Sequence, residues 1–362
     1  MQHRVASFEV HHTRFLDATG QLADDTPPGA ADADAIRTLY RWMMLARTFD
    51  TRAVRLQRTG QLGTYPSSLG QEAIHVGVAD ALAPRDVFLP TYRELGAQLL
   101  RGVTPVEMLL YWGGDERGSD FQGPRQDFPV CVPIATQATH AAGVASAFRL
   151  RGEDRVALCM LGDGATSKGD FYEALNLAGV WRLPVVFVVA NNRWAISVPL
   201  SRQTAAATLA QKAVAAGVHG EQVDGNDLVA VRHVTRQAVE RARAGEGPAL
   251  IECLSYRLGD HTTADDARRY RSDDEVSERW KEDPLPRLRT WLNTAHGWSS
   301  SDEEQLVESC TEQMDAAVKA YLSTPPAPPE SLFDHLYAEL PAAYAEQREQ
   351  LRRAATQEAG DG

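Results

Sequence analysis

Hydrophobic and polar positions divide the chain into a polar start, a long region of mixed strand and helix periodicity, and a helical end. The opening segment is polar and is interrupted by Pro27 and Pro28. From Ile36, the stretch IRTLYRWMMLARTFDTRAVRLQ repeats apolar residues at helical spacing. We therefore predict an N-terminal arm over residues 1–34 and a folded core that begins near Ala35.

Residues 155–192 carry the pattern of a βαβ unit. An apolar strand-like run, VALCML, leads into the turn GDG, and a second strand-like run, PVVFVVA, follows an amphipathic stretch. That stretch has apolar residues at i, i+3, i+4 and i+7, which are Phe171, Ala174, Leu175 and Ala178. Ser167 and Asp170 have the spacing of a capping box, so the helix is predicted to start directly after the turn.

The remaining pattern extends the α/β region and then changes to helix. A second crossover helix is predicted around Leu228 to Ala244, followed by the strand-like run ALIECLSYR. The class is therefore α/β, with a mainly parallel sheet covered by helices over residues 35–275. Residues 276–345 form a predicted C-terminal helical region, and residues 346–362 a polar tail. Within the helical region one stripe recurs every four positions, at Leu306, Cys310, Met314, Val318 and Leu322.

Composition and charge narrow the class of protein. The 362 residues can bury one large α/β core, and the net charge of -12 argues against general nucleic-acid binding. The run from Leu183 to Ala190 is too short to span a membrane, and the start MQHRVASFEVHHTRF lacks the apolar region of a signal peptide. We expect a soluble, cytoplasmic protein of bacterial type. The widely spaced cysteines predict reduced, packing residues, which are Cys131, Cys159, Cys253 and Cys310.

Chemistry is concentrated in two turns that follow the strands of the predicted βαβ unit. Asp163 lies in a Gly-Asp-Gly turn after the first strand, and Asn192 follows the second strand. Right-handed βαβ geometry brings these strand ends to one edge of the sheet, where α/β proteins usually bind ligands. A carboxylate and an amide oxygen are too few ligands to enclose Mg²⁺, so phosphate oxygens or water must complete its octahedron. The pair therefore predicts a magnesium site that binds a diphosphate.

Other phosphate-binding motifs fit this segment less well. GDGATSKG has neither the GxGxxG spacing of a dinucleotide fold nor the GxxxxGK[ST] spacing of a nucleotide-triphosphate loop. A lone Asp-Gly turn is common at strand ends and by itself predicts only a loop. Two turns on successive parallel strands favour a shared ligand site over that interpretation.

The segment LGDGATSKGDFYEALNLAGVWRLPVVFVVANNRWAIS resembles the thiamine-diphosphate motif of the alpha subunits of 2-oxoacid dehydrogenases. The similarity continues upstream through GQLGTYPSSLGQEAIHVGVADAL and LPTYRELG, and downstream through QKAVAAGVHGEQVDGNDLVAV and GEGPALIECLSYRLGDHTTADDARRYRS. It covers nearly all of the chain after about residue 35. The resemblance implies a thiamine-diphosphate-binding fold whose cofactors are thiamine diphosphate and Mg²⁺.

The resemblance also implies roles for residues of the two turns. Asp163 and the side chain of Asn192 are expected to bind Mg²⁺, with the main-chain oxygen of Trp194 as a third ligand. Gly164 and Ala165 are expected to line the diphosphate. The glycine allows the backbone to approach the ligand closely.

Three further segments match positions that reach the cofactor in this family. Tyr92 and Arg93 match a tyrosine-arginine pair that contacts the diphosphate, a role that suits a planar guanidinium. Val132 and Ile134 match positions of backbone and apolar contact, and without the resemblance they would be assigned to the core. His261 matches a loop histidine that contacts the diphosphate, handles protons and accepts the lipoyl group, whereas an arbitrary loop histidine is solvated.

The chain is expected to hold only the diphosphate-anchoring half of an active site, because the sequence before residue 155 is too short for a second α/β domain. The resemblance implies a beta subunit that completes the site in a heterotetramer of two alpha and two beta chains. It also implies a lipoyl-bearing dihydrolipoyl acyltransferase as a partner. The implied reaction is the oxidative decarboxylation of a 2-oxoacid with transfer of the acyl group to lipoamide.

The expected substrate is pyruvate, because GDG, GDFYEA and AQKAVAAG look most like the corresponding segments of bacterial pyruvate dehydrogenase alpha subunits. Branched-chain 2-oxoacids such as 2-oxoisovalerate are the second choice, and acetoin is the third. A hypothesis of a different class is a noncatalytic scaffold subunit. The intact set of candidate site residues argues against it.

Overall fold

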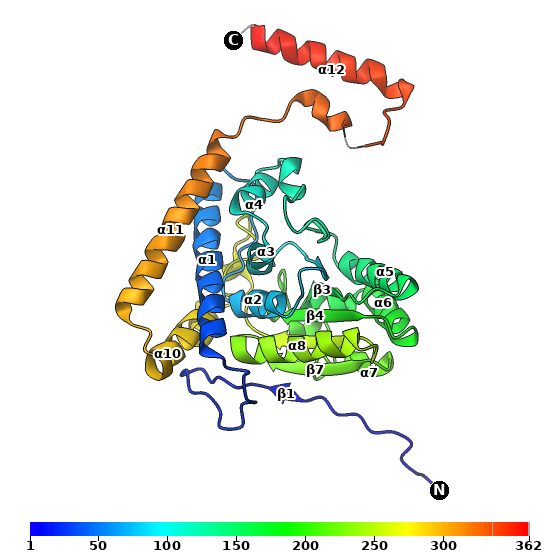
Figure 1. Ribbon diagram of the computed structural model, residues 1–362, viewed down its shortest axis with the longest axis vertical. Coiled ribbons are helices and arrows are strands. Elements are labelled where there is room, and N and C mark those ends of the chain that lie inside the picture. The colour runs from blue at the N-terminus through cyan, green and yellow to red at the C-terminus, as the bar shows by residue number, and fades with distance from the viewer. Residues whose placement is uncertain (335, 361–362) are drawn as a thin grey trace. The chain divides into compact units, whose positions relative to one another are not determined.

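The computed structural model describes residues 1–334 and 336–360. The chain divides into two compact units, Met1–Val318 and Lys319–Gly362. Within the described residues, the first unit contains a six-stranded sheet with helices on both faces (Figure 1). The expected class, a parallel sheet covered by helices with a helical C-terminal extension, is therefore confirmed. The finer segment boundaries drawn from the sequence stay predictions.

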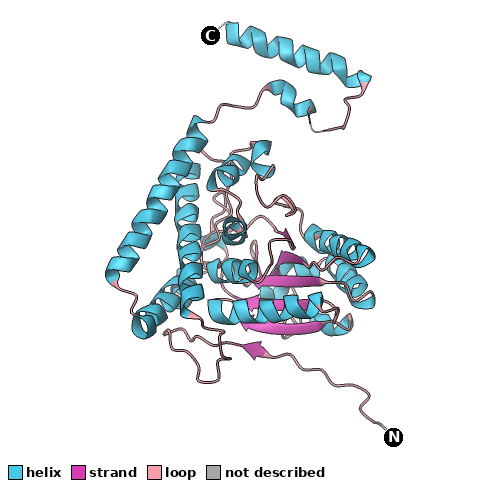
Figure 2. Cartoon of the chain, viewed as in Figure 1, coloured by secondary structure: helices cyan, strands magenta, loops and turns pink. Residues whose placement is uncertain are grey.

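The main sheet of the described chain is parallel throughout, with strand order β1-β7-β8-β4-β3-β2. Figure 2 shows strands in magenta among the helices. Its strands are β1 (His12–Thr13), β2 (Val87–Leu89), β3 (Ala157–Gly162), β4 (Val185–Asn191), β7 (His219–Asp224) and β8 (Ala249–Leu254). A separate antiparallel hairpin pairs β5 (Trp194–Ala195) with β6 (Val198–Pro199). The strands predicted from VALCML, PVVFVVA and ALIECLSYR are confirmed as β3, β4 and β8.

Helices cover both faces of this sheet. The faces have separate apolar cores, one shared with α5 and α6 and the other with α2 and α8. The helices of the described chain are α1 (Ala33–Arg58), α2 (Glu72–Asp80), α3 (Leu95–Arg101), α4 (Pro105–Trp112), α5 (Thr136–Arg151), α6 (Gly169–Val180), α7 (Lys212–Ala215), α8 (Leu228–Arg243), α9 (Asp273–Arg279), α10 (Pro284–His296), α11 (Ser300–Ser323) and α12 (Ala342–Gly360). The two predicted crossover helices are confirmed as α6 and α8.

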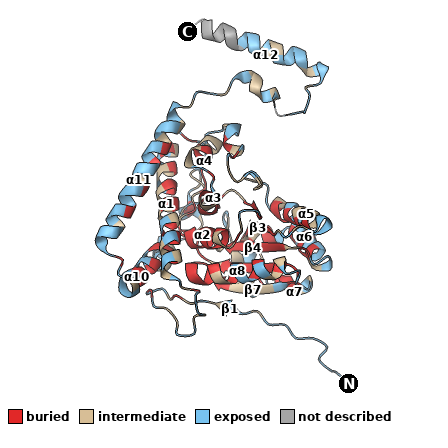
Figure 3. Cartoon of the chain, in the orientation of Figure 1, coloured by how far each residue is buried: buried red, intermediate tan, exposed pale blue. Residues whose placement is uncertain are grey.

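Successive residues of the central strands pack into opposite layers. In β4, Phe187 belongs to the α5 and α6 layer, whereas Val188 belongs to the α2 and α8 layer. Both are fully buried, and Figure 3 shows the same burial along the central strands and the helix faces that cover them. Each large apolar side chain buried in this way contributes about 1.5–3 kcal/mol to the free energy of unfolding. The result is a rigid platform for the turns at its edge.

The N-terminal arm is joined to the edge of the sheet. β1 extends the sheet beside β7, although its two residues carry no strand pattern in the sequence. The buried carboxylate of Asp227, at the start of α8, accepts hydrogen bonds of 2.7 Å from the main-chain N–H groups of Phe15 and Leu16. The same carboxylate caps α8 through Val229 and Ala230. One side chain therefore ties the arm to a crossover helix.

The start of α6 differs from the prediction. The helix begins at Gly169, and no side chain caps it. Asp163–Ser167 form a separate 3₁₀ turn, and the hydroxyl of Ser167 donates to the main-chain oxygen of Gln203 at 3.3 Å. The predicted capping box between Ser167 and Asp170 is therefore wrong, because the 3₁₀ turn moves Ser167 away from the N-cap position.

The stripe along α11 is only partly as predicted. Its first three members are buried, and these are Leu306, Cys310 and Met314. Ala317 takes the next buried position in place of Val318, and Leu322 is 49% exposed. A repeat of four exceeds the 3.6 residues of a helical turn, so such a stripe rotates steadily out of a straight interface.

Two expectations from composition can be compared with the structure. All four cysteines are free, and three of them are buried, as expected for reduced packing residues. Among the described residues, no helix combines the length and the apolar character needed to cross a bilayer.

Candidate cofactor and metal site

The turns after β3 and β4 lie side by side at the carboxyl edge of the sheet. The two strands are parallel neighbours, with Gly162 opposite Ala190 in the register. Asp163 begins the turn after β3, and Asn192 directly follows β4. The structure therefore brings together the two turns that the βαβ pattern placed at one edge.

Asp163 is a buried carboxylate with a neutral hydrogen-bond partner. It is 2% exposed, and its Oδ2 accepts a hydrogen bond of 2.7 Å from Nε2 of Gln203. Burial raises the pKa of Asp163 above its ordinary value, and the hydrogen bond from Gln203 opposes this shift. A carboxylate that is removed from water beside a neutral amide is stabilised in its charged form by a bound cation.

Asn192 is oriented by the hairpin that follows it and by a glutamine from another part of the chain. The hairpin β5–β6 requires left-handed backbone at Arg193 and Ile196, whose φ angles are 73° and 56°. The main-chain N–H of Trp194 donates to Oδ1 of Asn192 at 3.3 Å. Nδ2 of Asn192 donates to Oε1 of Gln71 at 3.4 Å. The amide is thus held from both sides.

The hairpin also passes very close to the turn after β3. A Cβ atom added at Gly164 would lie 2.7 Å from the Cβ of Ala195, which is closer than real Cβ contacts. At Gly162, the last residue of β3, an added Cβ would meet nothing within 4 Å. Packing against β5 therefore requires a glycine at position 164 and leaves position 162 free to carry a side chain.

One cavity of about 570 Å³ joins the residues that the sequence singled out. It lies at the carboxyl ends of β3 and β4. Every candidate site residue lines it, namely Tyr92, Arg93, Val132, Ile134, Asp163, Gly164, Ala165, Asn192, Trp194 and His261. Residues that are far apart in the sequence thus surround a single space.

Two arginines surround His261. Its Nδ1 lies 3.2 Å from Nη2 of Arg93 and 3.5 Å from Nη1 of Arg257. Burial and the two positive charges lower the pKa of His261 to about 4. The imidazole is therefore neutral near pH 7, and because guanidinium groups only donate, Nδ1 accepts and Nε2 carries the proton. The ring of Tyr92 stands edge-on to this imidazole, with 6.1 Å between ring centroids.

Arg257 connects the loop of His261 to the hairpin. It is 1% exposed and donates to the main-chain oxygen of Trp194 at 3.2 Å and to the hydroxyl of Tyr270 at 2.7 Å. The hydroxyl of Tyr270 in turn donates to Asp265, which accepts the main-chain N–H of His261 at 2.9 Å. A single buried guanidinium therefore couples the carbonyl of Trp194 to the position of His261.

The apolar wall of the cavity is open to solvent. Val132 and Ile134 both line the cavity, yet they are 52% and 47% exposed. The interpretation of these two residues as core, which was the alternative to a cofactor contact, is therefore wrong. They lie in the loop before α5, which enters the helix through a left-handed residue, Ala135, with a φ of 68°.

Several cavity residues were missed by the motif search. Gln71 and Gln137 are 1% and 2% exposed, and each has one side-chain atom without a partner in the described chain, Nε2 of Gln71 and Oε1 of Gln137. Trp112 also lines the cavity. Isolated glutamines have no motif spacing, so only the fold brings them here. The signal that could have found Gln71 was its place in the resembling segment SSLGQEAIHVG.

The polar groups of this cavity fit a magnesium ion that is bound through a diphosphate. No group of three or more His, Cys, Asp or Glu side chains in the described chain could hold a metal on its own. Asp163, Asn192 and the carbonyl of Trp194 supply oxygens of the kind that Mg²⁺ prefers, and phosphate oxygens complete such a set. The unpaired Nε2 of Gln71 and the guanidinium of Arg93 are suitable donors to phosphate.

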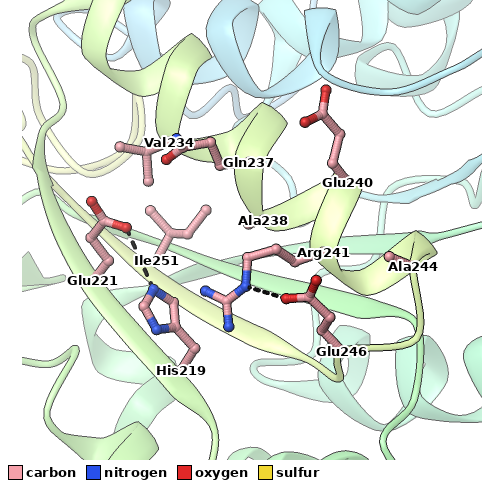
Figure 4. A pocket seen from close by; sticks show the side chains of 10 residues that line it. All are labelled: His219, Glu221, Val234, Gln237, Ala238, Glu240, Arg241, Ala244, Glu246 and Ile251. Carbon is pink, nitrogen blue, oxygen red and sulfur yellow. Dashed lines mark hydrogen bonds and ion pairs between the residues drawn. The ribbon is translucent and has the colours of Figure 1, made fainter. Parts of the chain in front are cut away.

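A second cavity, of about 510 Å³, lies towards the amino-terminal ends of β7 and β8 (Figure 4). Four of its side chains form two pairs, His219 with Glu221 at 3.6 Å and Arg241 with Glu246 at 3.2 Å. The side chains of Arg241 and Glu246 are 40% and 58% exposed, and those of His219 and Glu221 are 42% and 20% exposed, so water screens both pairs and they are worth little energetically. The cavity at the carboxyl edge is therefore the candidate site.

Comparison with known proteins places the chain in a family. Residues 40–330, most of the chain, match the family described as dehydrogenase E1 component. The chain belongs to this family. The resemblance to the alpha subunits of 2-oxoacid dehydrogenases, and with it the class of oxidoreductase, is thereby confirmed.

Two relatives of this E1 chain are alpha subunits of different dehydrogenases. The 3-methyl-2-oxobutanoate dehydrogenase subunit alpha of Mycobacterium tuberculosis is 46% identical over 88% of this chain and 87% of its own length. The pyruvate dehydrogenase E1 component subunit alpha of Staphylococcus aureus is 40% identical over 95% of this chain and 93% of its own length. The similarity therefore extends over almost the whole of each protein. The two relatives are named for different 2-oxoacid substrates.

Proposed function

We propose that this chain is the alpha subunit of a 2-oxoacid dehydrogenase and binds the diphosphate of thiamine diphosphate through Mg²⁺ at the carboxyl edge of its sheet. The observation that carries the proposal is the convergence of Asp163, Asn192 and Trp194 on one cavity with Arg93 and His261. When bound, thiamine diphosphate supplies the electron sink for decarboxylation. The protein binds it, orients it and controls protons around it.

The carboxylate of Asp163, Oδ1 of Asn192 and the carbonyl of Trp194 are the proposed metal ligands. The burial of Asp163 and its neutral partner Gln203 support this role, because the cation provides the missing positive charge. Gly164 and Ala165 follow Asp163 in the 3₁₀ turn, where the absence of a side chain at 164 admits the ligand as well as β5. The Mg²⁺ ion needs oxygens of the diphosphate to complete its ligands, and the diphosphate is bound beside Asp163 through the ion.

Arg93, Tyr92 and His261 are the further proposed contacts to the diphosphate. The guanidinium of Arg93 donates to main-chain oxygens of Ser67 and His261, which hold it at the cavity. His261 presents a neutral imidazole whose Nε2–H is available as a donor. We therefore assign His261 the role of a hydrogen-bond donor in the resting site and of the group that receives the incoming lipoyl arm.

A separate beta subunit is the proposed source of the missing wall. Val132 and Ile134 leave apolar surface of the cavity exposed, and burial of such surface stabilises association. We propose the family arrangement of two alpha and two beta chains, served by a lipoyl-bearing dihydrolipoyl acyltransferase. In it, the exposed side of the cavity faces the beta subunit.

The identity values favour a branched-chain 2-oxoacid as the substrate. The relative that acts on 3-methyl-2-oxobutanoate, which is 2-oxoisovalerate, is 46% identical, compared with 40% for the pyruvate dehydrogenase subunit. We therefore place 3-methyl-2-oxobutanoate first. Pyruvate, the substrate expected from the GDG, GDFYEA and AQKAVAAG segments, is the second candidate.

The test is decarboxylation by the full-length chain that is co-expressed with its beta subunit. Pyruvate and 3-methyl-2-oxobutanoate are compared by kcat/KM, with an artificial electron acceptor and with Mg²⁺ and thiamine diphosphate present or omitted. Turnover that needs both cofactors and prefers the branched substrate supports the proposal. A preference for pyruvate reverses the order of substrates, and inactivity on both refutes the proposed reaction.

A further inference from the structure

We propose that Gln203 is a positioning residue that makes Asp163 a one-oxygen ligand and thereby tunes the site for Mg²⁺ over Ca²⁺. The inference rests on the proposed function, because it concerns the metal that the cavity is proposed to bind. It assigns a role to a residue that has no motif and lies outside the set of candidate ligands.

Gln203 is fixed by both of its N–H groups. It lies after the hairpin β5–β6 and the short 3₁₀ turn Leu200–Arg202. Its Nε2 donates to Oδ2 of Asp163 at 2.7 Å and to the main-chain oxygen of Val198 at 3.0 Å. A glutamine amide has two N–H donors, so both are used. Turning the amide over would lose both bonds and bring Oε1 against a carboxylate.

This orientation limits how Asp163 can bind a metal. A hydrogen bond to a carboxylate is charge-assisted and about twice as strong as a neutral one. Ligation through both oxygens would therefore place the metal and the N–H of Gln203 on the same oxygen, Oδ2, where they compete for its lone pairs. Mg²⁺ needs a small octahedral set of oxygens, whereas Ca²⁺ takes six to eight and often binds carboxylates through both oxygens. A carboxylate with one oxygen engaged by Gln203 favours ligation through the other oxygen, which suits the smaller ion.

Gln203 also connects the hairpin with the metal ligands. An added Cβ at Gly164 would lie 3.8 Å from its Oε1, so the amide packs directly beside the turn of Asp163. Through Val198 the same amide holds β6, which pairs with the strand that contains Trp194. One side chain therefore touches the segments that supply two of the three proposed ligands.

The test measures metal preference rather than turnover. Full-length chains with their beta subunit are titrated with Mg²⁺ or Ca²⁺ at fixed thiamine diphosphate, and cofactor binding is followed by quenching of tryptophan fluorescence. Gln203→Met keeps the approximate size and removes the donor. Gln203→Glu keeps the shape and adds a carboxylate. The control is Gln237→Met, because Gln237 is exposed on α8 and lies outside this cavity.

We expect Gln203→Met to raise the Mg²⁺ concentration for half-saturation by about 10- to 100-fold, the usual effect of losing an outer hydrogen-bond partner of a metal ligand. The Ca²⁺ concentration for half-saturation should rise much less, so the preference for Mg²⁺ over Ca²⁺ falls. Gln203→Glu should lower that preference further, because its carboxylate is an additional ligand for Ca²⁺. Gln237→Met should behave as wild type.

Three results would overturn the inference. Unchanged Mg²⁺ dependence in Gln203→Met removes the role of Gln203 but leaves the proposed function intact. Equal weakening for both ions shows that Gln203 only supports the fold. Absence of metal-dependent cofactor binding in the wild type refutes the proposed function as well. If Gln203→Met lowers the unfolding midpoint of the cofactor-free protein, Gln203→Glu provides the test instead. The deciding quantity is again the ratio of the Mg²⁺ and Ca²⁺ concentrations for half-saturation.

Discussion

A methyl group added at position 164 should lower the stability of the fold, because the hairpin β5–β6 packs directly against this glycine. In Gly164→Ala the new Cβ is placed 2.7 Å from the Cβ of Ala195, so one of the two backbones must move. Neither methyl group can rotate away, because each is attached directly to the main chain. Overpacking of this kind typically costs about 1–3 kcal/mol in the free energy of unfolding.

A second substitution isolates this clash. Ala195→Gly alone removes the other methyl group and should cost about 0.5–1 kcal/mol through the added backbone freedom of glycine. In the double variant the clash is absent. Its loss of unfolding free energy should therefore be smaller than the sum of the two single losses by more than about 1 kcal/mol, which is within the range seen for residues in direct contact. Gly162→Ala is the matched control, because its Cβ meets nothing within 4 Å.

The measurement is urea unfolding of the four full-length chains and wild type without cofactor, followed by tryptophan fluorescence. We expect Gly164→Ala to be the least stable single variant, Gly162→Ala to be near wild type, and the double variant to recover part of the loss. If the effects of Gly164→Ala and Ala195→Gly simply add, or if Gly162→Ala is as damaging as Gly164→Ala, the close approach of β5 is not the reason for the glycine.

Three further predictions concern protons and buried charge. His75 is fully buried, and burial lowers its pKa to about 3, so as pH falls from about 6.5 the unfolded chain gains a proton that the native chain does not. Stability should fall by about 1.4 kcal/mol per pH unit from this residue, and His75→Leu should remove that slope in urea unfolding at pH 7 and pH 5. His261, with its pKa lowered to about 4, should show no ring titration near pH 6.5 by NMR of the cofactor-free protein, and a titration near pH 6.5 that disappears in His261→Gln would contradict the neutral assignment. Asp127→Ala should lose about 3–5 kcal/mol in unfolding free energy, because the carboxylate binds a buried Arg101, and a loss below 1 kcal/mol would refute this estimate.

The elements that the sequence predicts well are those whose environment is uniform along the chain. β3 and β4 are covered on both faces, so their sequences are continuously apolar and separated by a helix with apolar residues on one side. The positions of Asp163 and Asn192 followed from chain direction alone, because parallel neighbours end at the same edge. Local pattern was sufficient for this part of the site.

The parts that the sequence could not predict depend on contacts between distant segments. β1 has only two residues and is defined by its pairing with β7. Ser167 has the right spacing for a capping box, but the 3₁₀ turn takes it to Gln203 instead. Gln71 and Gln203 are isolated amides, and they acquire meaning only beside Asn192 and Asp163. Tertiary geometry therefore supplied the second layer of the site.

The central claim is that Asp163 anchors thiamine diphosphate through Mg²⁺ in a complex with a beta subunit. Calorimetric titration of thiamine diphosphate into the alpha-beta complex, with and without Mg²⁺, tests it for wild type and Asp163→Asn. Asn at this position removes a buried charge and keeps an amide that can bond to Gln203, so the cofactor-free fold should be no less stable. We predict Mg²⁺-dependent binding in the wild type that is lost in Asp163→Asn. Equal Mg²⁺-dependent affinity in both proteins would contradict the account.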